Sequence, residues 1–339
     1  MVTQKDIARK LGISRSLVSR AIAGTSGDIG ASEETVRRIH RMAEKCGYMP
    51  NAAAQSLRGV SSMTIGVVVK DFADPFFGKM IGEIQSLCKG RGFSMLLAGY
   101  SDGGDRQPDT RSLLRYSPDA ILICGSHVNT SWLRPFIAKC IPAMQIGSGK
   151  DCRGLSRIEM DEEHAVLLLL QHLKSLGHRE IAFIGNDTEP LLVRKKLVLA
   201  LARKKGMKLK DSFAVTVPAS DDAGISAIEK LLKVAGGKMP TAVIAADDMI
   251  AQGGLKALHE AGLSVPKDIS LTGIDDIPSS KLMIPALTTI SSPVSELVRA
   301  AFSFAVNRET AGEDIVVKIR PGLVVRESCS RAPGKTIRG

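Results

Sequence analysis

The 339-residue chain lacks long apolar runs and has no apolar stretch at its N-terminus. Its longest unbroken apolar runs, 165–170 and 197–202, are far shorter than the roughly 20 residues that a membrane-spanning helix needs. Because mostly polar residues follow Met1, we expect no secretory signal and a cytoplasmic location. These absences exclude membrane proteins, and a content of 44% hydrophobic and 24% charged residues is typical of a globular chain.

Closely spaced cysteines and histidines are missing as well. The six cysteines form no Cys-x-x-Cys pair, which argues against a zinc site or a disulfide framework and suits a reducing cytosol. The six histidines lack metal-ligand spacing, and His172 and His178, beside the end of a predicted helix, are interpreted as structural. The segment 147–150 resembles a phosphate-binding loop but lacks its first glycine. We therefore predict no metal, no cofactor and no enzymatic activity.

The charge of the chain is strongly positive and unevenly distributed. The net charge is +11, and the first 60 residues hold ten Lys or Arg against five Asp or Glu. A concentration of positive charge favours a polyanionic partner, although a charge-rich helical surface is often only solvated. Charge alone therefore points to nucleic acid without establishing it.

The first fifty residues are predicted to form three short helices around one small core. Thr3 can cap the first helix, with Asp6 reaching back to it, and Gly12 can end it in the left-handed conformation. Ser14 and Ser32 are the expected caps of the second and third helices.

From residue 63 onward, short β-rich runs alternate with amphipathic helical stretches. This alternation predicts parallel sheets with helices on both faces, and its length fits two lobes better than one. The predicted strands are 64–69, 94–98, 120–124, 143–146, 180–184, 214–217, 242–245 and 269–273, and the clearest predicted helices are 76–90, 162–176, 191–205 and 249–261.

Residues 5–22 have the spacing of a helix-turn-helix. Ala8 is small where the second helix crosses the first, Gly12 makes the turn, and Val18 packs back into the pair. In such a motif the second helix enters the DNA major groove, so Arg15, Ser16 and Leu17 are expected to face bases. The candidate DNA-binding residues of this motif are Thr3, Ser14, Arg15, Ser16, Leu17, Ser19 and Arg20.

The sequence resembles the LacI/GalR family of bacterial transcriptional regulators along nearly its whole length. The resembling motifs, in family order, are 5–8, 18–22, 32–35, 47–52, 54–57, 65–68, 74–77, 176–185, 246–248, 265–270, 273–278, 285–290 and 323–328. The resemblance implies an N-terminal all-α helix-turn-helix head plus an α/β periplasmic-binding-protein-like core of two doubly wound parallel-sheet lobes.

In the resembling family the segment that matches 50–58 is a hinge helix. Here it is under three turns long, so alone in water it should be largely unfolded. Leu57 is placed to wedge between base pairs in the minor groove, and Asn51 and Ala54 are further candidate DNA contacts. The alternative interpretation is a plain linker with helical propensity.

The resemblance also implies an effector-binding cleft at the carboxyl ends of the strands, with three chain crossings between the lobes. The crossings are expected near 160–162, 290–293 and 320–323. The expected domains are a DNA-binding head at 1–49, a hinge and linker at 50–60, an N-subdomain at 61–160 with 292–320, a C-subdomain at 161–291 with 321–330, and a disordered tail at 331–339.

Effector-binding residues are carried over by their motif positions. Phe76 could stack on a sugar ring, Arg194 is a basic clamp, and Asp247 and Asp275 could accept hydroxyl groups. Ser126 and Asp161 are weaker candidates. Asp247 stands where the family usually has Asn, and it could instead simply cap the following helix.

Together these features predict a cytoplasmic, homodimeric regulator, most consistent with a repressor of a carbohydrate or related catabolic operon. Its expected partners are double-stranded operator DNA and a small effector that is a sugar, a sugar acid or a sugar phosphate, with no membrane involved. The alternative is a cytosolic sugar-binding protein or enzyme on the same fold with no role at DNA.

Overall fold

The computed structural model describes residues 2–22, 31–48, 61–99, 108, 110–126, 131–149, 155–307 and 314–333. The proposed hinge at 50–60, with Asn51, Ala54 and Leu57, lies outside these described residues. No helix in the described ranges is both long and apolar enough to cross a membrane.

The N-terminal head consists of α1 (Gln4–Leu11), α2 (Arg15–Ile22) and α3 (Glu33–Lys45). The capping box at α1 is present in both directions between Thr3 and Asp6, and Gly12 follows the helix with φ 66°. Ser14 Oγ accepts a hydrogen bond from the Leu17 amide at 3.2 Å, which caps α2. Buried apolar side chains from all three helices form one small core that fixes the angle between α1 and α2.

The first lobe is built on a six-stranded parallel sheet with the order β11-β5-β4-β3-β1-β2. Its strands are β1 (Thr64–Val69), β2 (Ser94–Gly99), β3 (Ala120–Cys124), β4 (Ala143–Ile146), β5 (Ser156–Met160) and β11 (Val316–Ile319). Neighbouring side chains of a strand point to opposite faces, so Val67 packs against α5 (Pro75–Gly90) and α12 (Val294–Asn307). Val68 packs on the other face, under α6 (Thr110–Tyr116) and α7 (Arg134–Ile137).

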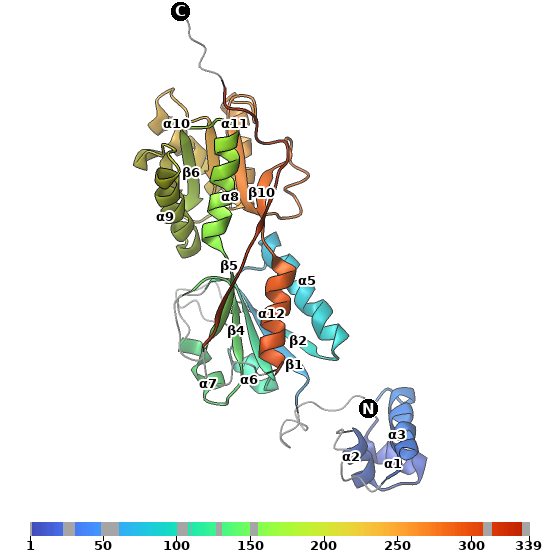
Figure 1. The fold of residues 1–339 in the computed structure, drawn as a ribbon. Coiled ribbons are helices and arrows are strands. Elements are labelled where there is room, and N and C mark those ends of the chain that lie inside the picture. The colour runs from blue at the N-terminus through green and yellow to red at the C-terminus, as the bar shows by residue number, and fades with distance from the viewer. Residues whose placement is uncertain are drawn as a thin grey trace, which may run out of the picture.

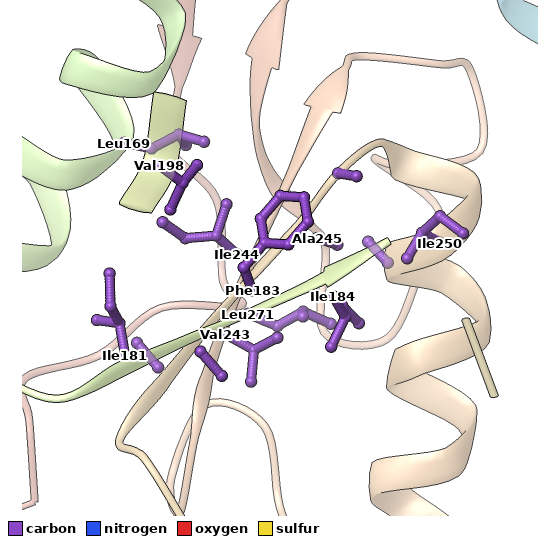
Figure 2. Close-up of a cluster of buried hydrophobic side chains, with 14 of the residues drawn as sticks. Leu169, Ile181, Phe183, Ile184, Val198, Val243, Ile244, Ala245, Ile250 and Leu271 are labelled. Carbon is purple, nitrogen blue, oxygen red and sulfur yellow. The ribbon is translucent and has the colours of Figure 1, made fainter. Parts of the chain in front are cut away.

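The second lobe repeats this plan with the strand order β12-β10-β9-β8-β6-β7. Its strands are β6 (Ile181–Asn186), β7 (Ala214–Val217), β8 (Ala242–Ala245), β9 (Ser270–Asp275), β10 (Thr288–Ser291) and β12 (Gly322–Val324), and its helices are α8 (Glu162–Ser175), α9 (Glu189–Lys204), α10 (Ala223–Ala235) and α11 (Asp248–Glu260). Only β12 is antiparallel, where it pairs with β10 at the edge of the sheet. Figure 2 shows Val198 of α9 beside Ile244 of the sheet, and Ile250 of α11 on the side of Ile184.

The chain passes between the two sheets three times (Figure 1). It crosses between β5 and α8, between β10 and α12, and between β11 and β12. The first two crossings meet where Ser292 Oγ donates to Met160 Sδ at 3.5 Å. Because each lobe is completed by a distant part of the sequence, movement of one lobe must bend these connections.

The first residues of the segment 331–339, which the sequence predicts to be a disordered tail, make hydrogen bonds to the second lobe. The Ala332 amide donates to the Leu176 carbonyl at 2.9 Å, and the preceding Ser330 carbonyl accepts from His178 Nε2 at 3.0 Å. These bonds hold the chain against the end of α8. Residues 334–339 lie outside the described part of the chain.

Candidate functional site

The helix α2 carries five of the ten predicted DNA-binding residues. Val18 and Ala21 turn into the head core, whereas Arg15, Ser16 and Arg20 are exposed and Leu17 and Ser19 are half-buried. A hollow of about 420 Å³ on this face is lined by Arg15, Ser16, Ser19 and Arg20. These residues share one side of the helix because positions four apart are neighbours on its surface.

The two predicted cap residues of the head are already engaged within the protein. Thr3 Oγ1 donates to Asp6 Oδ2 at 2.7 Å as part of the capping box. Ser14 Oγ lies 3.0 Å from Ser16 Oγ, as well as capping α2. Both side chains therefore stabilise the ends of helices that present the α2 face.

Charge also distinguishes α2 from its neighbours. No acidic residue occurs in α2, whereas Arg9 of α1 pairs with Asp6 at 3.3 Å and Arg37 of α3 pairs with Glu33 at 2.9 Å. The positive charge of Arg15 and Arg20 therefore stands on a helix without a carboxylate of its own. Such a helix suits a phosphate-lined groove.

Arg194 organises the second candidate site, at the edge of the second lobe. It is buried on α9, and both oxygens of Glu162 accept from its guanidinium, at 2.8 Å from Nε and 3.0 Å from Nη2. Nη1 donates to the Ala246 carbonyl at 2.8 Å, and Nη2 lies 3.6 Å from Asp275 Oδ1. The nearby carboxylates raise the pKa of Arg194 against the opposing effect of burial, so the group is permanently charged.

Asp275 and Asp247 both lie close enough to this guanidinium to interact with its charge. Asp275 ends β9 with φ 113°, a backbone conformation that L side chains rarely adopt, and burial raises its pKa well above the ordinary value. Asp247 caps α11, since its Oδ1 accepts from the Ile250 amide at 2.7 Å, and burial raises its pKa too. Asp247 therefore caps α11, as the alternative interpretation of this residue expected. The same carboxylate also interacts electrostatically with Arg194.

The first lobe contributes Lys70, Asp74 and Phe76 to the same region. Asp74 caps α5 by accepting from the Phe76 amide at 2.9 Å, and Phe76 packs edge-on against Phe77. Burial lowers the pKa of Lys70 and raises that of Asp74. Both residues interact electrostatically with Arg194 on the other lobe, and both with Asp247 as well. Charged groups from the two lobes therefore face one another.

The two weaker candidates do not join this cluster. Ser126 Oγ lies 2.9 Å from Ser148 Oγ, and Asp161 caps α8 by accepting from the His164 amide at 3.0 Å. Within the described ranges, neither residue makes a hydrogen bond or an ion pair with Arg194 or Asp275.

Sequence reasoning missed four charged residues of the region. Glu162 pairs with Arg194, Lys70 and Asp74 interact with it from the first lobe, and Asp248 interacts with Asp247 and Asp275 through its charge. Lys70 follows strand β1, and a polar residue at the carboxyl end of a parallel strand is a usable signal. Glu162 gives no comparable signal, because its partner is 32 residues away. Among the described residues, no group of three or more His, Cys, Asp and Glu is arranged to hold a metal ion.

Both the N-terminal head and the two-lobed core of the chain are similar to known protein families. Residues 3–51 match the family described as bacterial regulatory proteins, lacI family, and residues 170–329 match the periplasmic binding protein-like domain. Catabolite control protein A of Priestia megaterium is 26% identical over 322 residues, which cover 93% of this chain and 96% of that protein. The transcriptional repressor PurR of Actinobacillus pleuropneumoniae serotype 3 (strain JL03) is 27% identical over 335 residues, covering 97% and 98%.

Solved structures agree with this fold. The lac repressor dimer bound to operator and the anti-inducer ONPF superposes with a TM-score of 0.78 at 24% identity, covering 97% of this chain and 99% of that one. A LacI family transcriptional regulator from Enterococcus faecium with bound ribose gives a TM-score of 0.69 at 25% identity, covering 80% and 100%. A helix-turn-helix head joined to a two-lobed effector core defines a ligand-responsive, DNA-binding transcriptional regulator. The chain thus combines a lacI-family DNA-binding domain with a periplasmic binding protein-like domain, and it is similar along nearly its whole length to regulators that carry both.

Proposed function

We propose that the protein represses transcription as a homodimer in the cytoplasm. Two α2 helices would read the half-sites of a near-palindromic operator, with Arg15, Ser16 and Leu17 toward the bases. Ser19, Arg20 and the N-terminal end of α1 at Thr3 would contact phosphates. The segment 50–60 would pair with its copy in the minor groove, where Leu57 inserts between base pairs.

A small molecule bound between the lobes would control this affinity. The single observation that supports this control is the electrostatic interaction of Lys70 and Asp74 in the first lobe with Arg194 and Asp247 in the second. A ligand among these groups binds best at one separation of the lobes, and therefore shifts the population toward that separation. Allosteric coupling of this kind is commonly worth about 1–3 kcal/mol.

We further propose that the effector is a polyhydroxylated molecule and that the regulated operon serves carbohydrate catabolism. Asp247 and Asp275 offer carboxylate oxygens that suit hydroxyl groups, since hydrogen bonds to charged groups are directional and comparatively strong. Phe76 offers an aromatic edge or face at the N-terminus of α5. The ribose bound by the Enterococcus faecium relative is consistent with such a ligand.

A sugar-binding protein or enzyme without a role at DNA is the weaker alternative. The match of residues 3–51 to the lacI family of regulatory proteins and the acid-free α2 face favour the regulator. The relatives are named as transcriptional regulators, which is consistent with a protein that does not catalyse a reaction.

The test combines operator selection with ligand screening on the full-length chain. We expect duplexes selected from a random pool to share a near-palindrome and to bind more weakly as salt rises, because bound Lys and Arg release counterions from DNA. A screen of sugars by thermal shift should identify a ligand that stabilises the native state and changes operator affinity. Fluorescence anisotropy at two salt concentrations measures both effects.

Asp275→Asn is the better variant for testing the effector site. Arg194→Ala would leave the half-buried Glu162 without its partner and would remove a buried side chain, so loss of function could simply reflect unfolding. Asp275→Asn keeps the size of the side chain and should remove most of the ligand response relative to the ligand-free affinity of the same variant. A normal response in Asp275→Asn, or no binding to any duplex, would contradict the proposal.

A further inference from the structure

Within the described part of the chain, Arg194 supplies the guanidinium of the candidate effector site, and three of its five N–H groups already bond to the protein. Arg194 is buried. It donates hydrogen bonds from Nε and Nη2 to the carboxylate of Glu162 and from Nη1 to the carbonyl of Ala246. A bidentate ion pair of this kind fixes the plane of the guanidinium. Arg194 therefore neutralises Glu162, and two of its five N–H groups, one on Nη1 and one on Nη2, are left for a ligand.

The two lysines that follow Arg194 point elsewhere. Lys195 Nζ donates to Thr216 Oγ1 at 2.8 Å, toward the edge strand β7. Lys196 is exposed and lines a separate hollow of about 670 Å³ together with Arg203 and Lys208. The run of three basic residues in the sequence therefore does not become a triple positive charge in the site.

With Arg194 and Glu162 paired, carboxylates outnumber cations among the remaining groups. Asp74, Asp247 and Asp275 influence one another through their charges, and Lys70 is the cation that faces them from β1. Asp275 approaches Arg194 only at 3.6 Å, which is longer than a hydrogen bond. Burial raises the pKa of all three carboxyl groups, and neighbouring carboxylates add to this, Asp71 for Asp74, Asp74 for Asp247, and Asp247 with Asp248 and Asp74 for Asp275, so negative charge is unfavourable in this site.

We propose that the effector is a polyhydroxylated molecule carrying a protonated amine, such as an amino sugar, and not a sugar acid or a sugar phosphate. An ammonium group placed between Asp247 and Asp275 supplies the missing positive charge, while the hydroxyl groups bind the remaining carboxylate oxygens. An anionic ligand would instead add like charge to a buried site, which is unfavourable at low effective dielectric. Phe76, two residues after Asp74, adds an aromatic ring whose face attracts cations.

This inference rests on the proposed function, because it assumes that the cross-lobe cluster binds the effector. The sequence leads us to expect a sugar, a sugar acid or a sugar phosphate, and this inference replaces these three classes with a sugar that carries a positively charged amine. It also gives a role to the aspartate at 247, where the resembling family usually has asparagine.

The test uses matched hexoses on the full-length protein at pH 7. Glucosamine, galactosamine and mannosamine are compared by calorimetry with their N-acetyl derivatives, the parent sugars, the corresponding uronic acids and the 6-phosphates. At least one amine should bind about tenfold or more tightly than its N-acetyl and parent forms. Asp247→Asn should reduce that preference about tenfold, whereas the exposed Asp222→Asn should leave it unchanged.

Every result of the sugar-binding test either supports or contradicts the inference of an amine-carrying effector. Tighter binding of a uronic acid or a phosphate, equal binding of amine and parent sugar, or no binding of any amine overturns the inference. If a neutral or acidic sugar binds and its effect on operator affinity is lost in Asp275→Asn, the proposed function survives while the amine assignment fails. If no ligand of any class alters operator affinity, the proposed effector control fails as well.

Discussion

At the scale of single residues, Asp248 shows how a charged group can be buried for structural reasons beside a binding site. Its carboxylate accepts from Ser280 Oγ at 2.6 Å, from Thr289 Oγ1 at 2.5 Å and from the Ile277 amide at 3.0 Å. These bonds join the start of α11 to the loop between β9 and β10 and to β10 itself. Gly273 completes the fit, since a Cβ atom there would overlap Asp248.

The pKa of Asp248 makes a prediction about stability. Burial raises this pKa from 3.8 to about 6, so between about pH 4 and 6 the folded state holds a proton that the unfolded state has lost. The contribution of Asp248 to stability therefore falls as pH rises through that window. Lowering the pH from 7 to 5 should raise the free energy of unfolding of the natural protein by about 1 kcal/mol more than that of Asp248→Asn.

Urea unfolding followed by circular dichroism at the two pH values measures this difference. Asp222→Asn, an exposed acid on the same lobe, is the control and should follow the natural protein. Equal pH dependence in Asp248→Asn and the natural protein would show that this carboxyl does not change its protonation on folding.

Residue identity alone could predict part of the candidate site. The positions of Arg194, Asp247 and Asp275 follow from their motifs, and the capping alternative for Asp247 follows from its place before a helix. The pairing of Arg194 with Glu162 depends on how α8 and α9 pack, which no local pattern reports. The direction of Lys195 depends likewise on the neighbouring β7.

At the scale of elements, α2 carries a prediction about recognition. Arg15 is the first residue of α2 and is exposed on the face that lacks acids, so it is placed to donate two hydrogen bonds to a guanine. Arg15→Ala should weaken binding to the selected operator by about 1–3 kcal/mol and relax the preference at one base pair of each half-site.

The matched control is Arg37→Ala on α3, whose arginine is also exposed but is paired with Glu33. Competition binding against operators altered at single base pairs measures both affinity and preference. If Arg15→Ala weakens operator binding no more than Arg37→Ala, α2 does not read the DNA through this residue.

The eight strands predicted from β-rich runs are all present, with small differences at their ends. The strands that were not predicted, β5, β10, β11 and β12, are short or contain polar residues. In β10, for example, Thr288 and Thr289 are buried, and they are tolerated because Ser328 and Asp248 satisfy their polar groups. Those partners are 40 and 41 residues away, so the strand pattern could not be recognised locally.

At the scale of the whole molecule, an apolar surface supports the proposed dimer. Leu282 and Ile284, in the loop between β9 and β10, are 74% and 92% exposed. Large apolar side chains at such exposure are typical of an interface. Ser280 of this loop donates to Asp248, the residue that follows Asp247 of the proposed effector site, so one buried carboxylate connects the loop to that site.

Ile284→Glu should therefore shift the protein from dimer to monomer, because it would bring two carboxylates into the same apolar contact. Affinity for an operator with two half-sites should fall about a hundredfold as the benefit of linked binding is lost. Sedimentation velocity reports the oligomeric state, and Val234→Glu, an exposed apolar position on α10, is the control. A dimer that persists in Ile284→Glu would place the interface elsewhere.

The order in which the chain visits its two sheets has a consequence for synthesis on the ribosome. The helix α12 that covers β3, β4 and β5, and the strand β11 that closes the edge beyond β5, both come after the entire sheet of the second lobe except β12. A nascent chain can thus form its DNA-binding head early, yet it cannot close its first lobe until residue 319 has been added. Truncated chains would carry a folded head on an open, apolar sheet, which makes them targets for chaperones and proteases before they can compete for operators.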